Sequence, residues 1–100
     1  MITKGYVKEV ENVIEITNLT AMVYPNPHRG NFNIRIASPE NGIAKVDLFT
    51  VGGQKLITKS VGVSKGENNN VSFTGIRQGT VFYRVQIGKH IATGKVVGIE

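Results

Sequence analysis

The chain has 100 residues, of which 40% are hydrophobic and 12 are glycine, a composition typical of one small, turn-rich globular domain. It contains no cysteine, which excludes disulfides, thiolate metal sites and cysteine nucleophiles. The formal net charge is +5, but the lysines and arginines are spaced singly, so we expect no nucleic-acid partner.

Residues 1–21 show no clear period of apolar residues. Val10, Ile14 and Ile16 fit either an extra edge strand or the tail of a preceding segment. Charges interrupt this segment where a signal peptide needs a continuous apolar run, and no stretch approaches the roughly 20 apolar residues of a membrane span. We therefore predict that residues 1–21 are a linker or the end of an upstream segment, and that residues 22–100 form the domain.

From residue 20 onward apolar and polar residues alternate, which is the pattern of half-buried β-strands. No window has the apolar spacing of an amphipathic helix. The chain is therefore predicted to be all-β, with strands at residues 20–24, 31–37, 43–50, 54–61, 69–74, 80–87 and 90–98. The predicted inward-facing residues are Phe32, Ile34, Ile36, Ala44, Val46, Leu48, Val71, Phe73, Val81, Tyr83, Val85 and Ile87. The residues between them, such as Lys45, Asp47 and Phe82, are predicted to face away from the core.

Two prolines interrupt the alternation at the first turn. Proline cannot donate a backbone hydrogen bond, and it favours an extended conformation at the residue before it. Pro25 and Pro27 therefore end the first strand, and Gly30 supplies the flexibility for the turn into the second. We predict that this segment is a rigid corner that carries the chain from one sheet to the other.

The later turns are marked mainly by glycine. Asn41-Gly42 and Gly52-Gly53 suit tight turns, Gly88-Lys89 fits a two-residue hairpin, and residues 64–70 form a longer polar loop. Short strands separated by such turns need two packed sheets, because a single sheet would leave one apolar face in water. The pattern therefore predicts an antiparallel β-sandwich.

The sequence lacks the residue groups of a catalytic or metal site. The only histidines, His28 and His90, do not have a metal-binding spacing, and the 7 acidic residues show no evident acid/base pair. No nucleophile elbow and no phosphate-binding glycine loop occurs. We therefore expect no enzymatic activity, no metal and no cofactor.

Carbohydrate binding is a common function of small exported β-sandwiches. Sugar-binding platforms commonly use exposed tryptophan, and this chain contains none. The aromatic residues that remain as possible stacking faces are Tyr6, Tyr24, Phe49, Phe82 and Tyr83. A structural or carbohydrate-binding module of an exported protein is therefore an alternative function.

Three blocks of the sequence resemble one known family. "VYPNPHRGNFNI", residues 23–34, is similar to the opening motif of the type A carboxy-terminal sorting domains of the type IX (Por) secretion system in Bacteroidetes bacteria. "VDLFTVGGQKL" resembles the middle block of that family, and "IRQGTVFYRVQIGKHIATGKVVGIE" resembles its closing block. The blocks follow the family's order and cover about residues 22–100.

The resemblance implies an immunoglobulin-like β-sandwich of seven strands that acts as a sorting signal and not as an enzyme. It implies a larger cargo fused upstream, which passes through the periplasm and crosses the outer membrane by the type IX translocon and shuttle. The cargo would then be secreted or held at the cell surface. For many members a sortase-like peptidase removes the domain, and the cargo is joined to surface lipopolysaccharide.

The resemblance also implies a set of recognition residues, since these positions match the family's motifs. They are Tyr24, Pro25, Asn26, Pro27, Gly30, Gly53, Gly79, Tyr83, Gly94 and Lys95. Two positions depart from the motifs: Val81 stands where the family usually has tyrosine, and Thr50 replaces a frequent aspartate.

The last hairpin is where the family's transport signal is concentrated. We expect Lys89 and Lys95 to face solvent, while Val85 and Ile87 hold the hairpin to the core. Gly94-Lys95 matches the family's "GK" and is the expected contact with the translocon or shuttle.

Overall fold

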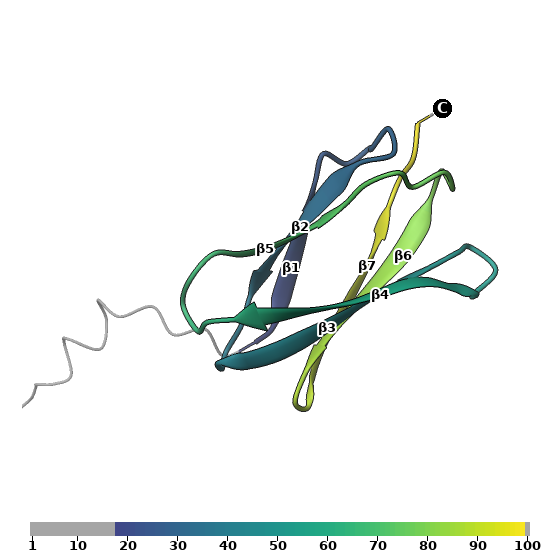
Figure 1. Cartoon of the computed structure of the whole chain (residues 1–100). Helices are drawn as coiled ribbons and strands as arrows, with labels where there is room; N and C mark the ends of the chain where they lie inside the picture. Colours follow the sequence, from purple (N-terminus) through teal and green to yellow (C-terminus); the bar gives the residue numbers. More distant parts are fainter. Residues whose placement is uncertain (1–17, 100) are drawn as a thin grey trace, which may run out of the picture.

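The computed structural model describes residues 18–99 and contains seven strands, in agreement with the seven predicted from the sequence (Figure 1). They are β1 (Thr20–Tyr24), β2 (Phe32–Ala37), β3 (Gly42–Phe49), β4 (Lys55–Val63), β5 (Asn69–Phe73), β6 (Val81–Ile87) and β7 (His90–Val96). Residues 18–99 contain no helix, and hence none long and apolar enough to cross a membrane. The expectations for Tyr6, Val10, Ile14 and Ile16 fall outside the described residues.

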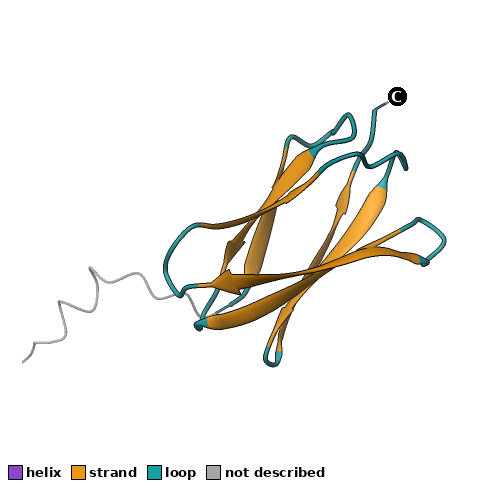
Figure 2. Cartoon of the chain, in the orientation of Figure 1, coloured by secondary structure: helices purple, strands orange, loops and turns teal. Residues whose placement is uncertain are grey.

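The strands form two sheets that face each other (Figure 2). One sheet has the strand order β1-β2-β5, and the other has the order β4-β3-β6-β7, with every pair antiparallel. β1 lies near β7 along one side of the sandwich, and β4 lies near β5 along the other. This arrangement is an all-β sandwich of the immunoglobulin-like kind, which confirms the predicted fold class.

The core consists of the residues that alternate inward on the strands of both sheets. Every residue that was predicted to face inward is buried. The core is completed by Leu19, Val63, Ile76 and Val96. Phe32 of β2 lies directly opposite Phe73 of β5, with their ring centroids 5.4 Å apart. Full burial of a phenylalanine side chain contributes about 1.5–3 kcal/mol, so this pair is a main anchor of the three-stranded sheet.

One end of the sandwich, which we call the proline end, holds the segments that carry most of the sequence motifs (Figure 1). Residues 25–31 join β1 to β2 there, residues 74–80 join β5 to β6, and the tail, residues 97–99, follows β7. The β3–β4 turn, residues 50–54, lies at the same end of its own sheet but stands apart from these segments.

The opposite end, which we call the hairpin end, holds residues 38–41, 64–68 and the β6–β7 turn at 88–89. The chain passes between the sheets at residues 38–41, 64–68 and 74–80. The prediction that the proline corner makes such a crossing is wrong, because β1 and β2 pair within one sheet. Proline ends a strand, but it does not determine which partner the next strand takes.

Glycine occupies turn positions that favour a left-handed backbone. In the β3–β4 turn Gly53 has φ +93°, and its N–H donates to the Thr50 carbonyl oxygen at 2.9 Å. Gly88 has φ +58° and opens the two-residue β6–β7 turn, as predicted. Asn41-Gly42 is not a hairpin turn, because Gly42 begins β3 directly after the crossing from the other sheet.

Asp47 lies on the outer face of the four-stranded sheet, as predicted, but its neighbours cover it there, since it is 1% exposed. The Thr58 hydroxyl donates to Oδ1 at 2.6 Å, and Arg84 Nη2 donates to Oδ2 at 3.0 Å. These partners are its direct neighbours on β4 and β6. Burial raises the pKa of the carboxyl, but the bonds from Thr58 and Arg84 and the charge of Lys55 outweigh it. The pKa therefore lies below the ordinary value of 3.8.

Candidate functional site at the proline end

The proline end brings together residues from separate parts of the sequence. The corner comes from the first block, whereas residues 74–80 and the tail lie in or beside the closing block, 51 positions later for the His28 bond to Gly79 and 71 positions later for the Asn26 bond to Val97. Of the positions that match the family's motifs, Gly53 alone lies apart, in the β3–β4 turn. The first and last blocks therefore meet in space.

Asn26 binds the end of β7 and the tail. Its Nδ2 donates to the Lys95 carbonyl oxygen at 3.4 Å, and the Val97 N–H donates to its Oδ1 at 2.9 Å. A side-chain amide offers the same donor and acceptor as a peptide group. The Asn26 side chain therefore forms the hydrogen bonds to β7 and the tail that the backbone of a neighbouring strand would otherwise form.

His28 extends this attachment through its backbone and its ring. Its N–H donates to the Val97 carbonyl oxygen, and its own carbonyl accepts the Ile99 N–H, both at 2.8 Å. The ring is buried, and its Nδ1 accepts the Gly30 N–H at 2.8 Å. Nε2 therefore carries the hydrogen and donates to the Gly79 carbonyl oxygen at 2.6 Å. Every polar atom of this neutral imidazole is satisfied.

We define the tail clamp as these hydrogen bonds of Asn26 and His28 to Gly79, Lys95, Val97 and Ile99. It requires close backbone approach: a Cβ on Gly98 would collide with the backbone of Gly79. A Cβ on Gly79 would meet nothing within 4 Å. The tail clamp therefore requires glycine at position 98, whereas the match to the family's motifs selected Gly79.

Tyr83 and Gly94 are direct cross-strand neighbours on β6 and β7. A Cβ on Gly94 would overlap the Tyr83 ring, so the glycine makes room for this ring in the core. Burial raises the pKa of the Tyr83 hydroxyl above its ordinary value of 10.0. Both positions therefore have a packing role. The predicted exposure in the hairpin is confirmed, since Lys89 and Lys95 are exposed and Val85 and Ile87 are buried, while the contact of Gly94-Lys95 with the translocon or shuttle stays a prediction.

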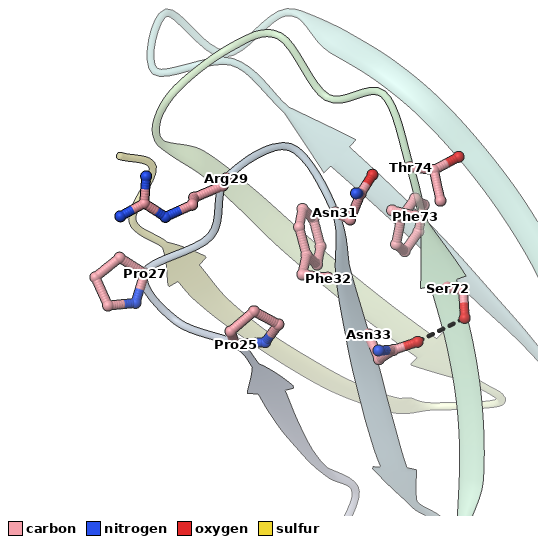
Figure 3. A pocket seen from close by; sticks show the side chains of 9 residues that line it. All are labelled: Pro25, Pro27, Arg29, Asn31, Phe32, Asn33, Ser72, Phe73 and Thr74. Atoms are coloured by element: carbon pink, nitrogen blue, oxygen red, sulfur yellow. Dashed lines mark hydrogen bonds between the residues drawn. The ribbon is translucent and has the colours of Figure 1, made fainter. Parts of the chain in front are cut away.

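A hollow of about 470 Å³ lies between the corner and strands β2 and β5 (Figure 3). Pro25 and Pro27 line its corner side, and polar side chains line the strand side. There the Ser72 hydroxyl donates to Asn33 Oδ1, as the dashed line in Figure 3 shows. Asn31 Oδ1 accepts a backbone N–H from Gly75. The hollow is thus an accessible surface directly beside the clamped tail.

Among the described aromatic rings that were considered as sugar platforms, Tyr24 and Phe49 are half-buried, Tyr83 is buried and Phe82 alone is exposed. A guanidinium lies over Tyr24 at 5.4 Å from the ring centroid, and another lies over Phe49 at 5.6 Å. Tyr83 is buried, and Phe82 is 38% exposed. The described residues therefore offer little of the open aromatic surface that sugar stacking uses.

The proline end and the adjoining parts of the strands are positively charged. Their basic residues are Arg29, Lys55, Arg77, Arg84 and Lys95. Within residues 18–99, Glu40 and Glu67 lie in hairpin-end loops, and the remaining acid, Asp47, is paired. The described part of the chain holds no group of three or more potential metal ligands. A partner that binds at the proline end would therefore meet a cationic surface.

Sequence reasoning missed the roles of His28 and Gly98. His28, between Pro27 and Arg29, gave no local sign of burial, because most of its partners lie far along the chain. Gly98 sits beside the matched "GK" block, but only the fold shows its approach to Gly79.

Comparison with known proteins gives one match. The family model described as "Secretion system C-terminal sorting domain" matches residues 22–100. No curated protein and no solved structure gives a significant match.

Proposed function

Because the chain belongs to the family of secretion system C-terminal sorting domains, we propose that it directs an upstream cargo through the type IX secretion system by presenting the proline end as a folded signal. Membership supports a C-terminal sorting signal for type IX secretion and an exported destination, at the cell surface or outside the cell. The family is not an enzyme family.

We further propose that the domain starts at about residue 22, after a linker or the end of the cargo. The cargo then passes through the periplasm. The translocon and shuttle read the matched residues of the first and closing blocks, Gly94-Lys95 among them. A sortase-like peptidase then removes the domain, and the cargo is attached to the cell surface.

The observation that carries the proposal is the meeting of the first and closing blocks in the tail clamp. Motif residues that are far apart in sequence lie together at one end, held by Asn26 and His28. Such a surface exists only in the folded chain, so a receptor that reads it would select folded domains.

The proposal is tested by fusing the complete chain to the carboxy terminus of a periplasmic reporter in type IX-competent cells. We expect the reporter to reach the surface or the medium, and to stay in the periplasm of cells that lack the translocon. The same fusion without residues 96–100 should remain inside, because it cannot form the tail clamp. Retention of the complete fusion in competent cells would contradict the proposed function.

A further inference from the structure

A second hollow, of about 470 Å³, lies on the outer face of the four-stranded sheet near the proline end. Its side-chain walls come from Phe49, Phe82, Arg84, Thr93 and Lys95. Tyr83 points into the core and Gly94 has no side chain, so the backbone of β6 and β7 forms its floor. We call this hollow the phenylalanine cleft.

The strand register explains why the cleft forms. Phe82 on β6 lies directly between Phe49 on β3 and Lys95 on β7. The next outward row places Arg84 directly opposite Thr93. Two phenyl rings thus stand beside two cations on one open sheet face.

The charge of the cleft is not balanced within it. Arg84 directs one nitrogen to Asp47 and holds its guanidinium over the Phe49 ring, yet its side chain remains 38% exposed. Lys95 is exposed, and no hydrogen bond or ion pair engages its ammonium group among the described residues. The cleft therefore combines apolar area with the unpaired charge of Lys95 and with a guanidinium that shares its charge with Asp47.

We propose that the phenylalanine cleft binds a segment of an export-machinery protein in which an apolar side chain is flanked by carboxylates. The apolar side chain enters beside Phe82, where burial of an exposed ring favours association. The carboxylates pair with Lys95 and with the exposed part of the Arg84 side chain, and this complementarity sets the choice of partner. The inference rests on the proposed function and adds the partner's chemistry to it.

Export of the complete chain, fused to a reporter as above, tests the cleft in cells. We expect Lys95→Glu to reduce export by roughly tenfold or more, because an attractive pair becomes a repulsive one. Phe82→Ser should have a similar effect. Lys89→Glu and Ile91→Ser are the matched controls, since they make the same changes at exposed positions of the same hairpin outside the cleft. Both controls should export like the unchanged chain.

The outcomes separate the two hypotheses. If the unchanged chain is not exported, the proposed function is wrong. If it is exported and Lys95→Glu is exported equally well, the cleft inference is wrong while the proposed function stands. Thermal melting checks that each variant is folded, and we expect Lys95→Glu to melt at nearly the same temperature as the unchanged chain, as surface substitutions usually do.

Binding is tested directly by NMR on the complete chain with two tripeptide probes. We expect acetyl-Glu-Phe-Glu-amide to shift the backbone amides of Phe82, Thr93 and Lys95 saturably at millimolar concentration. The charge-reversed acetyl-Lys-Phe-Lys-amide should not shift them, and Lys95→Glu should weaken the response. No saturable shift, or equal shifts with both peptides, would overturn the inference. So would a response of these amides to phosphatidylglycerol vesicles but not to the acidic peptide.

Discussion

The two ends of the sandwich are held together by hydrogen bonds of different range. At the proline end, Asn26 bonds to Val97 across 71 positions, and His28 bonds to Gly79 across 51. At the hairpin end, Asn69 bonds to Ser64 across 5 positions, as a donor and as an acceptor. The hairpin end combines such short-range bonds with bonds of intermediate range, from Asn69 to Ile36 across 33 positions and from Lys65 to Asn41 across 24, whereas the tail clamp spans 51 to 71 positions.

At the hairpin end, several side chains form hydrogen bonds to backbone groups of their own loop. The Asn69 amide also donates to the Glu67 carbonyl oxygen, and the Ser38 hydroxyl donates to the Glu40 carbonyl oxygen two residues on. Such side-chain bonds to nearby backbone are typical of polar loops. Part of the hairpin end is therefore closed by bonds within a single loop, whereas the hydrogen bonds of the tail clamp need segments that are far apart in the sequence.

The largest effect is expected from the core beneath the proline end. Phe32→Ala and Phe73→Ala should each lower the free energy of unfolding by about 3–5 kcal/mol, because each removes a buried ring. Phe32 also meets the His28 ring edge-on at 5.0 Å, so its loss should loosen the tail clamp. Urea unfolding measures the change, with the exposed Val51→Ala as control. A loss below about 1 kcal/mol would mean that the anchor lies elsewhere.

A pair of asparagine substitutions compares the two ends directly. Asn69→Ala should cost about 1–3 kcal/mol, since it leaves several backbone groups without partners, and Asn26→Ala should cost about 0.5–1.5 kcal/mol. Export should follow the opposite order, with Asn26→Ala reducing it and Asn69→Ala retaining it at a temperature where both are folded. Equal export of the two variants would show that the export machinery does not recognise the tail clamp.

Gly53→Val tests the turn that lies apart from the clamp. A valine at φ +93° is strained even though a Cβ there meets nothing within 4 Å. We expect a loss of about 1–2 kcal/mol in thermal unfolding. Gly52→Val is the matched control, because Gly52 is outside the left-handed region and a Cβ there makes only an ordinary contact. A smaller loss for Gly53→Val than for Gly52→Val would contradict the assigned turn.

The smallest effect concerns Asp47, which lies between the two ends. Its folded-state pKa is below 3.8, so its stabilisation is present above 3.8 and is lost as the pH falls through the folded-state pKa. Asp47→Asn should lack this contribution. The difference in unfolding free energy between the two proteins should therefore shrink as acid unfolding curves are taken below pH 3.8. A constant difference would indicate that the carboxylate charge does not stabilise the fold.

Much of this fold follows from local rules, whereas most of the candidate site does not. The alternation around Val46 and Leu48 predicted both the strand and its buried face. The same alternation placed Asp47 outward but could not predict its burial, which depends on Thr58 and Arg84 from two other strands. The alternation of apolar and polar residues predicts the faces of a single strand. It cannot predict contacts between side chains that come from several strands.

The proline end is the clearest case of this limit. Pro25 and Pro27 correctly predicted a stop and a turn, but the segment's partner is the tail rather than the other sheet. The motif match selected Asn26 and Lys95 without showing that one bonds to the backbone of the other. Resemblance therefore selected the candidate positions, and the fold shows how they are arranged.

The Asn26 bond to Val97 can form only late in synthesis. The ribosome adds Val97 71 positions after Asn26, so the side-chain amide of Asn26 lacks this partner until then. A chain that stops short of Val97, through a nonsense codon or proteolysis, leaves this amide and the His28 backbone without their partners. The clamp therefore closes only on chains translated through to the tail.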